Sequence, residues 1–142
     1  MTIELEEKDQ FKLTPEKLLE KITDKTKILI LPFPNNPTGA IMEKEELEEI
    51  VKIVLEKDLF VISDEIYSEL TYNGKRHVTI ASFPGMKERT VLINGFSKAY
   101  AMTGWRLGYA AAPHIILEQM LKIHQYASCA PLPPASTQPC QP

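Results

Sequence analysis

The sequence predicts an α/β fold in which helices flank a mainly parallel sheet. Two observations support this class: short apolar runs alternate with segments of helical periodicity, and a polar cluster follows each of the first three runs. With 142 residues, the chain can form one domain with a sizeable core but not two well-filled ones.

Three helices are predicted. Thr14 is a suitable N-cap and Pro15 suits the first helical position, and leucines and an isoleucine follow on one face. Residues 43–57 carry leucine, isoleucine and valine at helical spacing, which is typical of an amphipathic helix. Residues 114–126 form the third predicted helix.

Four strands are predicted, at residues 25–34, 58–65, 90–95 and 106–112. The second run is continuous and apolar, as is typical of strands that are covered on both faces.

Polar clusters follow the first three strands: "NNPTG" (35–39), "SDEIY" (63–67) and "NGFSK" (94–98). Ligands of open α/β sheets bind at the carboxyl ends of the parallel strands. The three clusters are therefore expected to contribute to one site.

Composition argues against several partners. The net charge of -3 provides no broad positive field for nucleic acid, and no apolar run approaches the roughly 20 residues that cross a bilayer. The polar start is not a signal peptide. Cys129 and Cys140 fit neither a disulfide framework nor zinc-ligand spacing, and the three histidines share no metal-ligand pattern. We expect a cytosolic protein without a metal site.

The clusters carry the groups that pyridoxal 5'-phosphate requires. A lysine in a partly apolar pocket, here Lys98, can form a Schiff base with a carbonyl. A carboxylate at a strand end, Asp64, can hold the proton of a ring nitrogen. The amide of Asn36 and the phenol of Tyr67 can both bond a ring oxygen, and Arg106 can take two phosphate oxygens.

The chain resembles the class I/II aminotransferases, the pyridoxal-phosphate-dependent family with the aspartate aminotransferase fold. The motifs that carry the resemblance are "NNPTG", "SDEIYSEL" and "GFSKAYAMTGWRLGY", in the family's order, and the resemblance covers roughly residues 10 to 130.

The resemblance implies a role for each candidate. Lys98 would carry the Schiff base and, once freed by the amino substrate, move the proton between the substrate Cα and the cofactor carbon, and Asp64 would pair with the pyridine nitrogen. Asn36 and Tyr67 would bind the ring oxygen, and Arg106 the cofactor phosphate. The resemblance also assigns backbone roles to three glycines, Gly39, Gly104 and Gly108.

Each candidate also has a simpler reading. Lys98 could be a solvated lysine, Asp64 could cap the turn that follows it, and Tyr67 could be a half-buried core ring. Asn36 could only shape the turn at Pro37, and Arg106 could pair with a surface carboxylate. Glu65, next to Asp64, is interpreted as structural.

The chain departs from the family pattern in three respects: one phosphate-binding position, its length and its last residues. A phosphate-binding serine of many relatives, three positions before the lysine, is here Gly95, for which Ser97 is a substitute. The resemblance implies family members of roughly two and a half times this length, so residues 1–130 are expected to be a fragment of the large, cofactor-binding domain.

The last twelve residues, 131–142, form a proline-rich tail that continues no periodicity and is expected to be disordered. One permitted codon choice for this tail, read two bases later, encodes "TPSQYAAL", a continuation expected of a relative. We hypothesise a frameshift near Pro131.

The resemblance predicts amino transfer between an amino acid and a 2-oxo acid in a homodimeric parent enzyme, with this fragment inactive alone. The alternatives are a non-catalytic remnant or cofactor-binding module, and a lyase or decarboxylase of the same fold. The sequence does not assign the substrate side chain.

Overall fold

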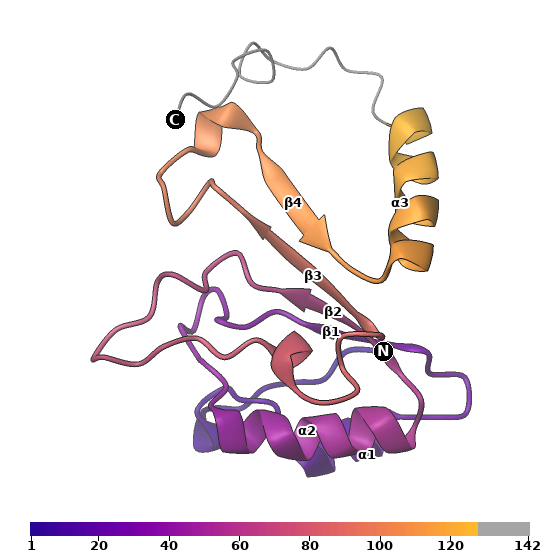
Figure 1. Cartoon of the computed structure of the whole chain (residues 1–142). Coiled ribbons are helices and arrows are strands. Elements are labelled where there is room, and N and C mark those ends of the chain that lie inside the picture. The colour runs from indigo at the N-terminus through magenta and orange to yellow at the C-terminus, as the bar shows by residue number, and fades with distance from the viewer. Residues whose placement is uncertain (128–142) are drawn as a thin grey trace.

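The computed structural model describes residues 1–127, which form a four-stranded sheet and three α-helices (Figure 1). The helices are α1 (Pro15–Lys21), α2 (Lys44–Glu56) and α3 (His114–Ala127); the strands are β1 (Ile28–Leu31), β2 (Phe60–Asp64), β3 (Thr90–Gly95) and β4 (Gly108–Ala111). Short 3₁₀ turns lie at η1 (Glu7–Asp9), η2 (Ile80–Ser82) and η3 (Thr103–Trp105). The proline-rich tail, residues 131–142, lies outside the described residues, and so do the predictions made for it.

The helix starts follow from local capping. The Thr14 hydroxyl accepts a hydrogen bond from the amide of Lys17 at 3.4 Å, and Pro15 opens α1 as predicted. Before α2, Glu43 and Glu46 form a reciprocal capping box, in which the Glu46 carboxylate accepts from the Glu43 amide at 2.8 Å. These caps satisfy backbone amides that the first helical turn leaves without partners.

The strands pair in the order β1-β2-β3-β4. β1 and β2 are parallel, as are β2 and β3, whereas β4 is antiparallel to β3. Helix α2 makes the crossover between β1 and β2, which a parallel pair requires, whereas a loop returns the chain from β3 to β4. The prediction of an α/β fold with a mainly parallel sheet is confirmed.

The core lies between the sheet and the two N-terminal helices, which lie together on one side of β1 and β2 (Figure 1). Leu29, Leu31 and Val61 face this side and are buried. Helix α2 contributes its apolar face, whose buried residues are Leu47, Ile50, Val51, Ile53 and Val54. Burial of this alternating set fixes the register of the strands, because a shift by one residue would expose all of it.

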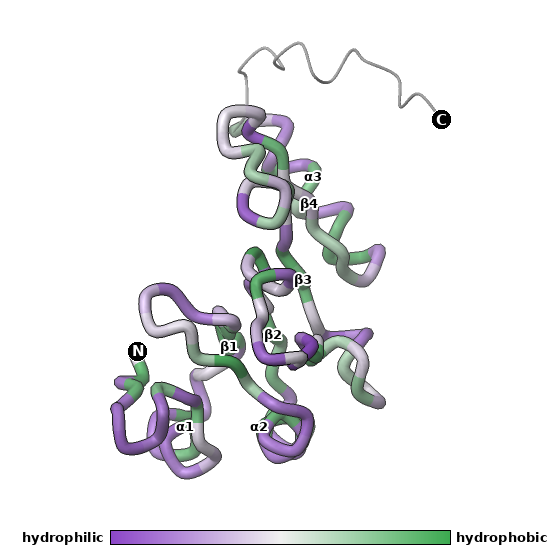
Figure 2. The backbone as a smooth tube through the Cα atoms, turned by 90° about the vertical axis from the view of Figure 1, so that its left-hand side faces the viewer, coloured by the Kyte–Doolittle hydropathy of each residue, from purple (hydrophilic) through white to green (hydrophobic). Residues whose placement is uncertain are grey.

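The expectation that β2 is covered on both faces was wrong. Phe60 is 43% exposed, and on β1 the side chains of Ile28 and Ile30 are exposed although the strand is hydrophobic throughout (Figure 2). The reason is that α1 and α2 cover one face only, while α3 lies beyond β4, away from them (Figures 1 and 2). The described part of the chain therefore presents an apolar sheet face.

Helix α3 also exposes large apolar side chains, including Ile115, Leu121 and Ile123. None of the helices within residues 1–127 is long and apolar enough to cross a membrane.

Matched substitutions on neighbouring residues of β1 test which face is covered. Ile30→Thr should change the free energy of unfolding by less than about 1 kcal/mol, because the side chain is 64% exposed and threonine suits a strand. Leu31→Thr should cost about 2–5 kcal/mol, because it removes buried volume and buries a hydroxyl. Urea unfolding followed by circular dichroism measures both, and equal costs would contradict this packing.

Candidate functional site

The three predicted clusters lie at one edge of the sheet. β2 ends at Asp64 and β3 at Gly95, and "NNPTG" follows β1 after a short connection. Because the three strands are parallel neighbours, their carboxyl ends meet at the same edge. The expected placement at the strand ends is confirmed.

The loop after β1 is held by its own backbone. The amide of Asn35 donates to the carbonyl of Ala40 at 2.9 Å, and the amide of Gly39 donates to the carbonyl of Asn35 at 2.8 Å. Gly39 has a φ of 71°, a left-handed conformation that glycine adopts without strain. This closed turn presents Asn36, whose Nδ2 donates to the hydroxyl of Tyr67 at 3.2 Å.

The turn after β2 positions Asp64 and Tyr67. Oδ1 of Asp64 accepts from the amide of Ile66 at 3.2 Å, so the simpler role of Asp64 as a turn cap is present in the structure. Within residues 1–127, Oδ2 of Asp64 makes no hydrogen bond. One carboxylate oxygen of Asp64 is therefore available to a ligand at the strand end.

Lys98 lies in the loop between β3 and β4 and is exposed. Its Nζ lies 5.5 Å from the centroid of the Tyr67 ring, within the range of a cation–π contact. Asn36, Tyr67 and Lys98, from three separate strand ends, thus form a contiguous set that we call the Asn36–Tyr67–Lys98 cluster.

Arg106 is not in direct contact with this cluster. Its guanidinium donates to the carbonyl of Thr103 at 2.9 Å. It makes no ion pair with a carboxylate in the described part of the chain, so the alternative that Arg106 pairs with a surface carboxylate was wrong. Arg106 and Ala101 both have a φ of 53°, a conformation that costs energy in residues with a side chain. Two such residues in one loop give it its shape.

Aromatic packing supports the same loop. The ring of Phe96 lies 5.7 Å from that of Tyr100 and 5.9 Å from that of Tyr109, between centroids. Tilted pairs at these distances are favourable. Tyr100 and Tyr109 therefore both pack against Phe96.

Gly95, the position where many relatives are expected to carry serine, has no room for a side chain. A Cβ at this position would lie 3.0 Å from the carbonyl oxygen of Leu107, 3.2 Å from Cα of Gly108 and 3.3 Å from Cδ1 of Ile66. The close approach of the β3–β4 loop explains the glycine. Ser97, next to Lys98, is half-buried.

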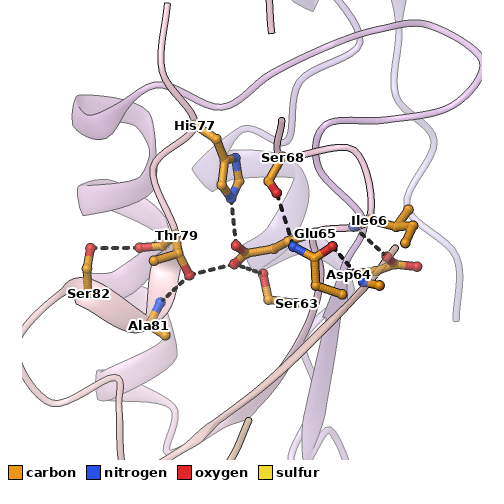
Figure 3. Close-up of polar contacts among 11 residues, drawn as sticks. Ser63, Asp64, Glu65, Ile66, Ser68, His77, Thr79, Ala81 and Ser82 are labelled. Atoms are coloured by element: carbon orange, nitrogen blue, oxygen red, sulfur yellow. Dashed lines mark hydrogen bonds and ion pairs between the residues drawn. The ribbon is translucent and has the colours of Figure 1, made fainter. Parts of the chain in front are cut away.

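A buried carboxylate lies beside the site. Glu65 contacts Ser63, His77 and Thr79 through its side chain (Figure 3). Burial alone would raise its pKa, but the hydrogen bonds with these three residues hold the pKa of Glu65 below the ordinary value. The structural role predicted for Glu65 matches this position, whereas its partners, 12 and 14 residues further along the chain, gave no sequence signal.

A groove of about 460 Å³ adjoins the cluster. Its lining includes Asn36, Tyr67, Tyr72 and Lys75. A larger cavity of about 690 Å³, between the N-terminal segment and β1, contains none of the five predicted site residues. Of the five predicted site residues, Asn36 and Tyr67 line the 460 Å³ groove, whereas Asp64, Lys98 and Arg106 do not.

Comparison with known proteins decides the family. The family model of aminotransferase class I and II matches residues 1–140. The chain belongs to this family.

Individual relatives agree with this assignment. The chain is 48% identical to an aspartate aminotransferase of Pyrococcus abyssi, over 89% of the chain and 32% of that protein. It is 46% identical to aromatic-amino-acid aminotransferase 2 of Thermococcus litoralis, again over 89% of the chain and 32% of the relative. The crystal structure of an aromatic aminotransferase from Pyrococcus horikoshii superposes with a TM-score of 0.89 at 49% identity, covering 93% of this chain and 35% of the other.

This class I and II aminotransferase chain spans about a third of the length of the curated relatives that it matches. The part that it covers includes all three motifs of the predicted site.

Serine at position 95 tests the close packing of the β3–β4 loop. Gly95→Ser should lower the free energy of unfolding by about 1–3 kcal/mol, because the added atoms meet backbone rather than a flexible side chain. Gly104→Ser is the matched control, since no atom lies within 4 Å of a Cβ there, and should cost less than about 0.5 kcal/mol. Urea unfolding compares the two variants, and a Gly95→Ser variant as stable as the control would show that the loop lies further from β3.

Proposed function

We propose that this chain forms part of the cofactor site of a pyridoxal-phosphate-dependent aminotransferase, which moves an amino group between an amino acid and a 2-oxo acid. The observation that carries the proposal is the Asn36–Tyr67–Lys98 cluster at the carboxyl edge of the sheet, in a chain of the aminotransferase family. Bound pyridoxal phosphate supplies an electron sink that stabilises negative charge at the substrate Cα.

The donor set fits this cofactor. The amide of Asn36 and the hydroxyl of Tyr67 already share a hydrogen bond of 3.2 Å, so both can turn toward one ring oxygen. The free oxygen of Asp64 would accept a hydrogen bond from the protonated ring nitrogen, and this charge pair would keep the ring protonated. These residues would hold and orient the ring.

Lys98 has the reactive role in the proposal. Its amine would condense with the carbonyl of the cofactor, whose oxygen leaves as water. Once displaced by the substrate amine, the freed amine would carry the proton between the substrate Cα and the cofactor carbon. The Tyr67 ring beside Nζ limits where the amine can reach. Arg106 would bind the phosphate, which requires its guanidinium to exchange the Thr103 carbonyl for phosphate oxygens.

The substrate side chain is left open. Relatives of nearly equal identity, 48% and 46%, are named for aspartate and for aromatic amino acids. The proposal is therefore limited to the reaction class.

A non-catalytic, cofactor-binding role is a second candidate. It rests on the same Asn36–Tyr67–Lys98 cluster, which would hold the cofactor whether or not amino transfer follows. The homodimeric state and cytosolic location expected from the resemblance are also proposals. The exposed apolar face of β1 supports association.

Borohydride reduction of the chain mixed with pyridoxal phosphate tests the site. Wild-type chain should carry close to one reduced adduct, located at Lys98 by peptide mass spectrometry, because Nζ of Lys98 lies 5.5 Å from the ring centroid of Tyr67, which is hydrogen-bonded to Asn36. Lys98→Ala should lower adduct formation at least tenfold, whereas Lys87→Ala, an exposed lysine outside the site, should not.

Adducts spread over surface lysines, unchanged in Lys98→Ala, would refute the proposed site. Incubation of loaded wild-type chain with amino acids and 2-oxo acids separates the two candidate functions. Stoichiometric binding without amino transfer would favour the cofactor-binding module.

A further inference from the structure

Glu65 is a buried carboxylate that the proposed chemistry does not use. Its exposure is 3%, whereas the site candidates on either side of it in the sequence, Asp64 and Tyr67, are only partly buried. Burying a carboxylate is costly unless hydrogen bonds compensate, and an apolar side chain would fill the same space without that cost. Its presence here calls for a role.

The side chain of Glu65 points to the covered face of the sheet. Side chains alternate along a strand, and Val61 and Ser63 are buried on the same side as Glu65, whereas Asp64 is more exposed. Glu65 thus contacts the covered face at the end of the strand, on the side opposite to Asp64.

Three side chains bind the carboxylate (Figure 3). Oε1 accepts from the hydroxyls of Ser63 at 2.9 Å and Thr79 at 2.5 Å, and Oε2 lies 2.7 Å from Nε2 of His77. Ser63 comes from β2 itself, whereas His77 and Thr79 come from the segment that leads into η2. The carboxylate therefore joins the end of β2 to a separate part of the chain.

That second part is itself well anchored. The Thr79 hydroxyl accepts from the amide of Ala81 at 3.3 Å, and the Thr79 carbonyl accepts from the hydroxyl of Ser82 at 2.8 Å. Ile80 between them is 1% exposed in the core. Glu65 is thus tied to a fixed point rather than to a mobile loop.

The backbone of Glu65 sets the turn that carries the ligand groups. Its amide donates to the carbonyl of Ile93 in β3 at 2.8 Å, and its carbonyl accepts from the amide of Ser68 at 2.9 Å. The Ser68 hydroxyl in turn accepts from Nδ2 of Asn94 at 3.0 Å. The direction of Asp64 and Tyr67 therefore depends on how firmly residue 65 is held.

We propose that Glu65 is a positioning residue of the candidate site, which together with Ser63, His77 and Thr79 fixes the strand end that directs Asp64 and Tyr67. The inference rests on the proposed function, because pyridoxal phosphate is the group toward which these two side chains are directed. In this proposal Glu65 acts through Asp64 and Tyr67 and does not itself contact the cofactor.

Hydrogen exchange of the cofactor-free chain tests the positioning itself. Glu65→Gln keeps the shape but removes the charge, and should raise the exchange rates of the Ile66 and Ser68 amides at least tenfold. The rates of the Val61 and Ile62 amides in β2 should stay within about twofold. Glu69→Gln is the matched control, because it makes the same substitution at an exposed position of the same segment. It should change none of these exchange rates.

Two results would overturn the positioning role: unchanged exchange at residues 66–68, or a uniform increase throughout β2 and β3, which would show a contribution to global stability only. If Glu65→Gln does not fold, His77→Gln provides the same comparison at a partner whose side chain is only partly buried. There the same local increase is expected, with the same two contrary results.

Cofactor binding supplies the second measurement. Glu65→Gln should weaken pyridoxal phosphate binding about tenfold and alter the absorbance maximum of the bound cofactor, while Glu69→Gln should match wild type. If wild-type chain binds no cofactor, the proposed function fails, and hydrogen exchange alone still decides whether Glu65 holds the strand end. Normal binding and spectrum in Glu65→Gln would overturn the inference.

The pH dependence of stability shows whether the ionised form acts. Because the pKa of Glu65 is lower in the folded chain than its ordinary value of 4.5, its contribution is present above that value and is lost as the pH falls through the folded pKa. The difference in unfolding free energy between wild type and Glu65→Gln should therefore be largest at neutral pH and shrink in acid. A difference that grows in acid would contradict an ionised Glu65.

Discussion

The parallel pairing of β1, β2 and β3 is the constraint on which the candidate site depends. Parallel neighbours end at one edge, so residues that are 31 positions apart in the sequence, Asn36 and Tyr67, can share a hydrogen bond there. Lys98 joins them because β3 pairs with β2 in the same direction. Burial of one face of β1 and β2 against α1 and α2 sets the register, and through the register it sets which side chains lie at the edge.

The antiparallel return of the chain after β3 contributes the second group of site residues. β4 runs back along β3 with Gly95 opposite Gly108, and the loop between them carries both Lys98 and Arg106. The left-handed backbone conformation of Ala101 and Arg106 and the packing of Phe96 against two tyrosines give this loop its shape. The strand edge and the loop thus contribute different groups, and Glu65 holds the strand edge from the covered face.

Much of this could be predicted from the sequence, because helix periodicity, caps and polar clusters after apolar runs are local signals. The covered faces could not, since "ILIL" reads the same whether one or both faces of β1 are buried. The partners of Glu65 are also invisible in the sequence, because they depend on where a separate segment packs. Arg106 was predicted to begin a strand at residues 106–112, but it lies in the loop before β4 with a left-handed backbone conformation that no residue pattern specified.

A crystal structure of the chain grown with pyridoxal phosphate tests the central claim most directly. We expect the cofactor at the carboxyl ends of β1, β2 and β3, with continuous density to Nζ of Lys98, the ring oxygen beside Asn36 and Tyr67, and the ring nitrogen beside Asp64. A cofactor bound elsewhere in the crystal, or strand ends that do not bring Asn36, Tyr67 and Lys98 together, would contradict the account.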